Sequence, residues 1–396
     1  MRFFHLSDLH IGKLLYRYNL TQDQRVILGQ IVALAKQEKP DAILMAGDIY
    51  DKPVPSAEAV ALFDDFLTAL SEITPQIPIL IISGNHDSAQ RLEYASSILK
   101  KERVYVAGMP PQGKQEHIRK VTLSDDAGEV DFYLLPFIRP AMVRCAFDDA
   151  ENEALVKKAR ESGRSEYDVY FEALLKREKI DTSRRNVLLT HQFFVSGTYA
   201  PERTDSEIMT VGTLDQIDTG HLSVFDYVAM GHIHRPQKCG SAHFRYSGCP
   251  MAYSVSEEKD EKAITVVTLG DKGKEVEISY LPLIPERRVR KIEGSLQEVL
   301  SFGYSEDYVS ILLTDEVTER FVMERIRECY PHYLEIVLQS VLRRKEAGKR
   351  EMADMSMDFE TLFAQFFAQQ NGREMTQNEK ELFEMVYHMA REDDET

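Results

Sequence analysis

The sequence predicts an α/β protein, α+β in its later part, in which two packed sheets are flanked by helices and followed by a small α/β domain and a helical tail. Three observations predict this architecture. Strand and helix patterns alternate over residues 1–140, short strands joined by turns follow residue 185, and the pattern changes again near residue 285. The chain of 396 residues is long enough for two or three domains.

The first 140 residues have the pattern of βαβ units. Two amphipathic helices, at 21–40 and 56–73, separate apolar runs of strand length. The first helix starts with a predicted capping box formed by Thr21 and Gln24. Strands separated by helices favour a mainly parallel sheet. The predicted strands are 2–7, 42–48, 77–87, 104–108 and 130–137.

The middle of the chain predicts a second sheet. Residues 141–183 are polar and helix-like, and they form an insertion between strands. The strands predicted after the insertion are short, are joined by turns and lack long helices between them. We therefore expect them to form a sheet that packs against the first one. They are 186–191, 226–234, 244–250, 263–270 and 275–283.

From residue 285 a β-α-β-α-β pattern predicts a small module, and a charged linker and two short amphipathic helices follow it. The predicted domains are therefore 1–284, 285–345 and 346–396. Each tail helix has an apolar face that it cannot bury alone. Such faces usually mark protein contacts, and folding back onto the body is the alternative. The faces consist of Phe359, Leu362, Phe363, Phe366 and Phe367 in the first helix and Leu382, Phe383, Val386 and Met389 in the second.

The composition limits the classes of function. The chain has 48 Lys and Arg against 65 Asp and Glu, a formal net charge of −17, so a nucleic-acid site would need a local basic patch or bound cations. The four cysteines form no C-x-x-C pair, which argues against a disulfide framework or a zinc ribbon. The longest apolar runs are far shorter than the roughly 20 residues of a membrane span. We expect a soluble, cytoplasmic protein.

Several predicted strands end in side chains that bind metals. Asp8 and His10 lie two residues apart and would point to the same side of an extended chain, and His232 and His234 repeat that spacing. In an open α/β sheet, ligands collect beyond the carboxyl ends of the strands. One such residue alone is more often a turn former or a buried core histidine, but five such segments are hard to explain that way. The candidates are Asp8, His10, Asp48, Asn85, His86, Asp87, His191, His232 and His234.

The chemistry of these candidates indicates the type of metal. Carboxylate oxygens, an amide oxygen and imidazoles without a thiolate suit Mn²⁺, Fe²⁺ or Zn²⁺ better than a structural zinc site. Seven ligands are too many for one ion and fit two ions that share a bridging carboxylate. Two ions roughly 3.5–4 Å apart can hold both the attacking and the departing oxygen of an in-line displacement at phosphorus. Water between two such ions also loses a proton more easily than bulk water.

The order of these motifs, D-x-H, G-D, G-N-H-D, H and G-H-x-H, resembles the calcineurin-like metallophosphoesterase superfamily. A narrower resemblance covers nearly the whole chain and points to the SbcD family, the nuclease subunits of bacterial SbcC–SbcD DNA-repair complexes. The stretches that carry it are "SDLHIGK", "GDIYDKPVPS", "SGNHDSAQRL", "THQFFVSG", "GHIHRPQ" and "YSGCP". Each stretch is weak alone, and the set is specific.

The resemblance implies a role for each candidate. Asp8, His10 and His234 would hold one metal ion, Asn85, His191 and His232 would hold the second, and Asp48 would bridge the two. His86 would stabilise the phosphorane or protonate the departing 3′-oxygen, a role that suits histidine at neutral pH, and Asp87 would orient it. Arg91 is a candidate phosphate contact. Asp51 stands where archaeal relatives have a further histidine.

The resemblance also implies an activity. The family consists of Mn²⁺-dependent DNA nucleases, 3′→5′ exonucleases on double strands and endonucleases on single strands and hairpins, and Mg²⁺ or Fe²⁺ are alternative cofactors. They act with SbcC, an SMC-type ATPase, in double-strand break repair, recombination and replication, which implies a nucleoid-associated protein. A different phosphoesterase, such as a protein phosphatase or cyclic-nucleotide phosphodiesterase, is the alternative. A non-catalytic scaffold is a second alternative.

The resemblance gives functions to the later domains and to the oligomer. The domain at 285–345 would be a cap that helps to position DNA, and the tail would bind the coiled coil of SbcC. Family members pair as homodimers through the phosphoesterase domain. Basic side chains at the start of the cap offer phosphate contacts, and an ordinary solvated strand is the alternative. These side chains are Arg287, Arg288, Arg290 and Lys291.

Overall fold

The computed structural model describes residues 1–207, 215–315 and 322–340, and in the tail residues 363, 367, 373–377, 379 and 380. Within these residues, two six-stranded sheets form the body. The first has the order β16-β15-β1-β4-β5-β6 and the second the order β13-β14-β12-β9-β8-β7. The strands of the first sheet are β1 (Arg2–Leu6), β4 (Ala42–Ala46), β5 (Ile79–Ile82), β6 (Val104–Ala107), β15 (Ala263–Thr268) and β16 (Glu277–Pro282). Those of the second are β7 (Arg119–Asp125), β8 (Gly128–Leu135), β9 (Arg185–His191), β12 (Tyr227–Gly231), β13 (Gln237–Cys239) and β14 (Ser241–Tyr246).

Strand direction follows the connections between strands. β1, β4, β5 and β6 are parallel, as the βαβ pattern predicts, and β15 and β16 add antiparallel strands at one edge. In the second sheet β8, β9, β12 and β14 are parallel, and the hairpin partners β7 and β13 lie at the edges. Two short pairs complete the strands of the body, β2 (Leu14–Leu15) with β3 (Tyr18–Asn19) and β10 (Phe193–Val195) with β11 (Gln216–Asp218).

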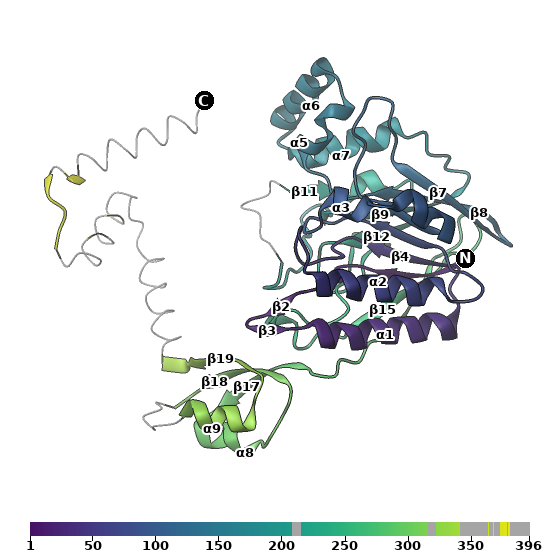
Figure 1. The fold of residues 1–396 in the computed structure, drawn as a ribbon. Helices are drawn as coiled ribbons and strands as arrows, with labels where there is room; N and C mark the ends of the chain where they lie inside the picture. Colours follow the sequence, from purple (N-terminus) through teal and green to yellow (C-terminus); the bar gives the residue numbers. More distant parts are fainter. Residues whose placement is uncertain are drawn as a thin grey trace.

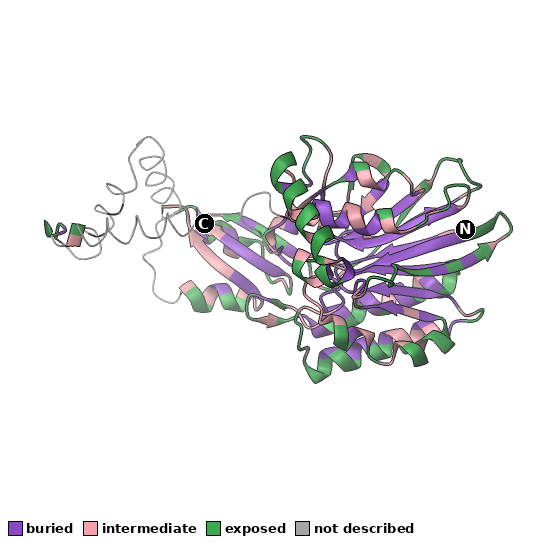
Figure 2. Ribbon diagram, turned by 90° about the horizontal axis from the view of Figure 1, so that it is seen from above, coloured by how far each residue is buried: buried purple, intermediate pink, exposed green. Residues whose placement is uncertain are grey.

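The two sheets pack face to face between two layers of helices (Figure 1). Phe3 and Leu44 of the first sheet meet Phe132 and Tyr227 of the second in one buried cluster, and the Phe3 and Phe132 rings meet edge to face. Burying one such side chain contributes about 1.5–3 kcal/mol. Figure 2 shows the buried strands between the exposed outer faces of the helices. A second sheet packed against the first is confirmed, but its predicted strands are partly wrong. The last two predicted strands, β15 and β16, join the first sheet through the pairing of β15 with β1, and β8, which was predicted with the first set of strands, pairs with β9 in the second sheet. Strand patterns along the chain do not encode which strands pair, because pairing depends on tertiary contacts.

The helices cover the outer faces of the sheets (Figure 1), and short 3-10 turns complete the connections. The helices against the first sheet are α1 (Thr21–Glu38) and α2 (Ala57–Ser71). The helices of the predicted insertion pack against the second sheet and are α5 (Pro140–Val143), α6 (Asp149–Ser162) and α7 (Glu166–Arg177). Two short helices, α3 (Ala89–Glu93) and α4 (Ser96–Leu99), follow β5. The 3-10 turns are η1 (Lys100–Glu102), η2 (Arg144–Ala146), η3 (Thr219–Leu222) and η4 (Val255–Glu257).

The predicted capping box at the start of α1 is wrong. Leu20 is the N-cap residue, and its side chain makes no capping hydrogen bond. The Thr21 hydroxyl donates instead to Asn19 Oδ1, 2.6 Å away. The Gln24 side chain is buried and turns toward the loop that follows β1. Thr21 and Gln24 therefore have the spacing of a capping box, but Gln24 makes a tertiary contact instead.

The predicted β-α-β-α-β module is confirmed in its elements. Its parallel sheet β17-β18-β19 has its own core, centred on Val299, Val309 and Ile311. The module begins beside α1, where buried Asp23 accepts hydrogen bonds from Arg287 Nη1, at 3.1 Å, and from the Tyr308 hydroxyl, at 2.9 Å. Its elements are β17 (Val289–Gly294), α8 (Leu296–Ser301), β18 (Tyr308–Leu313), α9 (Val322–Cys329) and β19 (Tyr333–Leu338).

Most of the predicted tail lies outside the described residues. Phe363 and Phe367 are described and are half-buried, and the Arg373 guanidinium lies 5.1 Å from the centroid of the Phe367 ring. The other tail residues predicted to form apolar faces lie outside the described residues, and they are Phe359, Leu362, Phe366, Leu382, Phe383, Val386 and Met389. In the part of the chain that the structure describes, no helix is both long and apolar enough to cross a bilayer.

Candidate metal centre

The strand ends bring the seven predicted ligands to one edge of the two sheets. β1, β4 and β5 of the first sheet and β9 and β12 of the second each end at this edge. Parallel strands present their carboxyl ends together, which is why residues from far-apart segments meet. Asn85 is half-buried and the others are buried. The seven are Asp8, His10, Asp48, Asn85, His191, His232 and His234.

One group of donors consists of Asp8, His10 and His234. The Nε2 atoms of His10 and His234 lie 3.0 Å apart. One carboxylate oxygen of Asp8 and one ring nitrogen of each histidine lie within 4.8 Å of one another. Asp8 is held in place because its Oδ1 accepts a hydrogen bond from the backbone N–H of His232 at 3.0 Å. This geometry can surround one cation.

A second group of donors consists of Asn85, His191 and His232. Asn85 Oδ1 lies 3.0 Å from His191 Nε2 and 3.0 Å from His232 Nδ1. His191 Nδ1 donates to the carbonyl oxygen of Ala46 at 2.8 Å. When Nε2 carries no proton, this hydrogen bond leaves its lone pair free for a metal, as outer hydrogen bonds to ligand histidines commonly do.

Asp48 lies between the two groups. Its Oδ2 is 3.5 Å from His10 Nε2 and 3.3 Å from His191 Nε2. Its Oδ1 accepts a hydrogen bond from the backbone N–H of His86 at 2.8 Å. One carboxylate therefore reaches both donor groups, which is the position of a bridging ligand.

The electrostatics of these groups favour cations. Burial, with the Asp48 charge adding to it, raises the pKa of Asp8 to about 7. Burial lowers the pKa of His232 to about 3. Burial also acts to lower the pKa of His191, but the Asp48 carboxylate outweighs it and raises this pKa to about 9. Buried charges of this kind are costly unless they are paired or coordinate metals, so the donor set fits two divalent cations.

The loops that carry the ligands have an unusual backbone. Four of the predicted ligands have positive φ angles, 53° at Asp8, 43° at His10, 50° at Asp48 and 100° at His232. Such residues are strained and persist where the surroundings enforce them, most often at functional sites. A Cβ on Gly84 would lie 2.1 Å from Asp48 Oδ1. The glycine of the "GNHD" motif therefore leaves room for the proposed bridging carboxylate.

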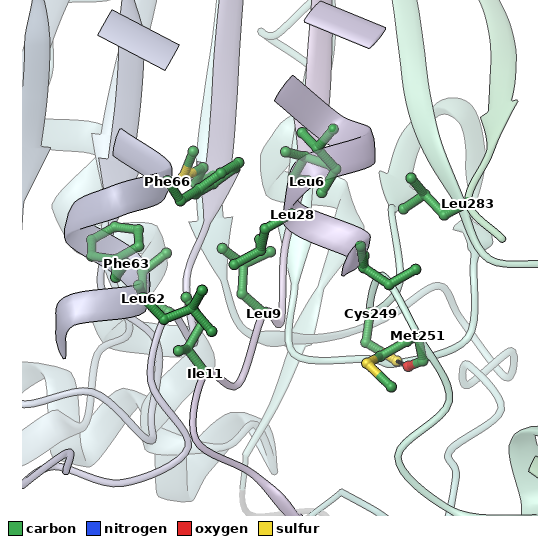
Figure 3. Close-up of a cluster of buried hydrophobic side chains, with 14 of the residues drawn as sticks. Leu6, Leu9, Ile11, Leu28, Leu62, Phe63, Phe66, Cys249, Met251 and Leu283 are labelled. Atoms are coloured by element: carbon green, nitrogen blue, oxygen red, sulfur yellow. Dashed lines mark hydrogen bonds between the residues drawn. The ribbon is translucent and has the colours of Figure 1, made fainter. Parts of the chain in front are cut away.

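Core packing and hydrogen bonds from α1 hold the loop after β1 in place. Leu9 and Ile11 flank His10, and Figure 3 shows them turned into the core toward Leu28 and Leu62. Gln24 of α1 donates to the carbonyl oxygen of His10 at 2.7 Å and accepts from the N–H of Gly12 at 2.9 Å. Sequence reasoning missed Gln24 in this role because its spacing from Thr21 matches a capping box.

His234 has a supporting residue that the sequence did not indicate. Ser206 Oγ lies 2.6 Å from His234 Nδ1, so the other ring nitrogen faces the site. The backbone N–H of His234 donates to Glu207 Oε1 at 2.8 Å. Both residues come from a loop that lies far from the strand-end motifs, and no sequence signal in that loop singled them out.

His86 lies beside the first donor group. Its ring meets the His10 ring edge to face, with centroids 4.7 Å apart, and a ring nitrogen comes within 4.8 Å of donors from His10 and Asp48. Its Nδ1 donates to the carbonyl oxygen of Asp51 at 2.9 Å. The prediction that Asp87 orients this ring is wrong. The Asp87 carboxylate accepts backbone N–H groups instead, including those of Gly84 and Tyr50, each at 2.9 Å.

Asp51, which stands where archaeal relatives have a histidine, forms an ion pair. Its Oδ1 lies 2.8 Å from Lys13 Nζ and 3.4 Å from His10 Nδ1. Although burial acts to raise the pKa of Asp51, hydrogen bonds from His10 and Lys13 lower it. Asp51 is therefore an anion that supports the His10 ring from the side away from Asp48.

The basic residues predicted to bind DNA are spread over several surfaces. Arg91 is exposed on α3. Arg287 is engaged with Asp23, and Arg290 forms an ion pair with Asp307 at 3.1 Å. Lys291 lines a cleft of about 960 Å³ between the module and the body. Arg288 lines a different cavity, between the module and the end of β16.

Comparison with known proteins adds a family to this geometry. A family model described as calcineurin-like phosphoesterase matches residues 1–236, and one described as type 5 capsule protein repressor C-terminal domain matches residues 285–371. The SbcD subunit of the SbcCD nuclease from Staphylococcus saprophyticus is 29% identical over 391 residues, 98% of this chain and 97% of that protein. The protein of the same name from Staphylococcus epidermidis is 28% identical over 382 residues, 95% of each.

Solved structures give more distant likenesses. A dimetal phosphatase from Danio rerio aligns over 72% of this chain and 97% of its own at 12% identity, with a TM-score of 0.40. The phosphopantetheinyl hydrolase PptH from Mycobacterium tuberculosis aligns over 63% of this chain and 89% of its own at 15% identity, with a TM-score of 0.31. Likenesses at this level carry no argument about activity or substrate.

Proposed function

Because the chain belongs to the calcineurin-like phosphoesterase family, we propose that it is a metal-dependent DNA nuclease, the catalytic subunit that acts with an SbcC-type ATPase. The proposal rests on the length of one sequence match. Similarity to the staphylococcal SbcD protein runs through 98% of this chain, so it includes the module after residue 285 as well as the metal centre. The proposed domains are 1–284 for phosphodiester cleavage, 285–345 for the cap and 346–396 for partner binding.

The two donor groups support the following proposed ligands. Asp8, His10 and His234 hold one cation, Asn85, His191 and His232 hold the other, and Asp48 reaches both. When bound, the two cations supply Lewis-acid stabilisation and activate water at neutral pH. Mixed imidazole, carboxylate and amide donors suit Mn²⁺, with Mg²⁺ or Fe²⁺ as alternatives.

In this proposal, His86 acts on the substrate at the departing oxygen or at the phosphorus oxygens. The Asp51 carbonyl engages Nδ1, so Nε2 is the nitrogen left for the substrate. In its imidazolium form the ring donates a proton from Nε2 to the leaving 3′-oxygen, or a hydrogen bond to the negative charge that develops on phosphorus oxygens. Asp87 contributes indirectly, because it holds the backbone of the loops that carry Asp48 and Asn85.

We propose that DNA lies in the cleft of about 960 Å³ between the body and the module, next to residues that contact the centre. Ser206 and Tyr253 line it next to His234 and His10, and Lys13 and Lys291 face it from the two sides. Phosphate contacts of this kind position a nucleic acid without reading its sequence. Lys291 is the predicted DNA contact that this placement favours most, while Arg287 serves mainly as an anchor of the module.

A cleavage assay tests the proposed function. The full chain, loaded with Mn²⁺, is incubated with a 3′-labelled duplex, a hairpin, a phosphopeptide and a cyclic nucleotide. We expect both DNA substrates to be cut, with all activity lost in EDTA and restored by Mn²⁺. Turnover of the phosphopeptide or the cyclic nucleotide alone would contradict the nuclease function and favour another phosphoesterase. Failure to retain any metal after loading would favour a scaffold.

The same proposal includes partners. An SbcC-type ATPase should co-purify with the full chain and be lost when residues 346–396 are deleted. A homodimer through the phosphoesterase domain is also proposed, and the segment of α3 and α4 is the candidate face because it exposes two large apolar side chains, Tyr94 at 82% and Ile98 at 67%. Ile98→Asp should give monomers in analytical ultracentrifugation, whereas an unchanged dimer would move the interface elsewhere. On this proposal the protein works in the cytoplasm, at the nucleoid.

A further inference from the structure

A second cavity borders the metal centre on the side of Asn85. It has a volume of about 400 Å³, and Asn85 and Asp87 of the loop after β5 form part of its wall. Phe137 and Arg139 from the segment after β8 form another part. Among the described residues, this cavity shares no lining residue with the larger cleft beside the module. Asn85 is thus a proposed ligand that lines this cavity, whereas the lining of the larger cleft, within the described ranges, contains none of the seven.

The segment that carries Phe137 is tied to the metal loop. The backbone N–H of Phe137 donates to the carbonyl oxygen of Ser83 at 3.0 Å, two residues before Asn85. The half-buried Phe137 ring lies edge to face with the His191 ring, with centroids 6.3 Å apart. An aromatic ring is thus held at a fixed place beside the ligands of the second donor group.

Arg139 adds a planar cation to this ring. Its guanidinium lies 5.6 Å from the centroid of the Phe137 ring, within the range of a cation–π contact. Arg139 is exposed, and its side chain forms no salt bridge or hydrogen bond within the described ranges. The side chain of Gln90, also on the cavity wall, is likewise exposed and has no hydrogen-bond partner among the described residues. These groups are available to a ligand in a chain of net charge −17.

In another part of the wall, the polar groups already have hydrogen-bond partners. The Gln112 side chain donates to the carbonyl oxygens of Pro110 and Met142, each at 3.1 Å, and its Oε1 lies 3.6 Å from Cys145 Sγ. This wall is therefore built to keep its shape, whereas Arg139 and Gln90 are left with unused hydrogen-bonding capacity. An aromatic ring, a free guanidinium and a free amide around one cavity are the groups that stack on a nucleobase and bind its edge.

We propose that this cavity binds the unpaired nucleobase next to the scissile phosphate, stacked on the Arg139–Phe137 pair. The inference rests on the proposed nuclease function and names a substrate contact that lies outside the cleft beside the module. A volume of about 400 Å³ lies at the lower end of the range for ligand pockets, roughly 300–1,000 Å³, and suits one nucleoside rather than a duplex. Base stacking tolerates every sequence because each base has an aromatic face.

The test compares two DNA substrates and a small diester. One duplex is intact, one carries abasic residues on both sides of the bond that is cut, and the small diester is bis(4-nitrophenyl) phosphate. For the wild-type protein with Mn²⁺ we expect kcat/KM to fall about tenfold on the abasic duplex, the size typical of one lost stacking contact. Arg139→Ala should lose about the same factor on intact DNA, lose nothing further on abasic DNA, and keep its rate on the small diester.

Control variants separate the explanations. Phe137→Leu should likewise cleave intact and abasic DNA at similar rates, and Arg144→Ala, which removes an exposed guanidinium outside the cavity wall, should behave as wild type. Full activity of Arg139→Lys on intact DNA would overturn the stacking role, because it would assign Arg139 to a phosphate. An abasic penalty that persists in Arg139→Ala would also overturn it.

The outcomes distinguish this inference from the function on which it rests. If the wild-type protein cleaves the small diester but neither duplex, the proposed nuclease function fails and the base site fails with it. If it cleaves the intact and the abasic duplex equally well, the nuclease function stands and the base site alone is refuted. Equal loss of all three activities in Arg139→Ala would mean that Arg139 maintains the structure of the centre, which also refutes the base site.

Discussion

Asp48→Ala is expected to abolish metal binding and DNA cleavage together. The Oδ2 atom of Asp48 lies 3.5 Å from His10 Nε2 and 3.3 Å from His191 Nε2, so a single carboxylate serves both donor groups. Its removal leaves each group one ligand short and removes the anion that balances two cations. Metal ions contribute several kcal/mol to the transition state, which corresponds to a loss of at least about 10³-fold in kcat/KM.

The test measures both the metal content and the activity of each variant. After loading with Mn²⁺ and dialysis, elemental analysis should give two ions per wild-type chain and fewer than one per Asp48→Ala chain. Asp48→Asn keeps the shape of the side chain and should still lose most of the metal, because its amide carries no charge. Asp65→Ala removes an exposed carboxylate from α2 and serves as the control. Two tightly bound ions in Asp48→Ala would contradict the bridging role.

The position of Asp48 was accessible to sequence reasoning for a simple physical reason. It directly follows an apolar run, and the carboxyl ends of parallel strands meet at one edge of a sheet. The same argument placed Asp8, His191 and His232, although β9 and β12 belong to a different sheet from β1. These residues come together because each stands next to a strong strand signal, and their roles as ligands stay predictions.

The contacts that hold the ligands were not accessible in the same way. Gln24 binds the loop of His10 from a neighbouring helix, and the local pattern around it is equally typical of a capping box. Ser206 and Glu207 support His234 from a loop without a strand signal. Such contacts depend on tertiary packing, which the pattern of a single sequence does not encode locally.

Charge clusters were the least informative signal. The run of basic residues that begins at Arg287 has the composition of a phosphate-binding strand, yet Arg287 binds Asp23, which lies 264 positions earlier in the chain. Arg139, by contrast, stands alone in the sequence and faces the cavity beside Asn85. What matters for a binding site is which charges remain unpaired after folding, and that depends on distant partners.

His86→Ala is expected to lose most cleavage and to keep both metals. The ring nitrogen Nδ1 is engaged by the Asp51 carbonyl, and each donor group is complete without His86. Loss of a general acid typically costs about 10²- to 10⁴-fold, so kcat on DNA should fall by that factor. Metal content should stay at the wild-type value, and added imidazole should restore part of the activity.

Substrates with different leaving groups distinguish the two proposed catalytic roles of His86. A 3′-alkoxide is a poor leaving group that needs a proton, whereas 4-nitrophenolate leaves without one. If His86 is the acid, His86→Ala should slow DNA cleavage by about 10²-fold or more and slow bis(4-nitrophenyl) phosphate cleavage far less. Equal losses on both substrates with full metal content would assign His86 to stabilisation of the phosphorane instead. Loss of metal in His86→Ala would make His86 a ligand, which its position within 4.8 Å of His10 and Asp48 donors allows, and would overturn both catalytic roles.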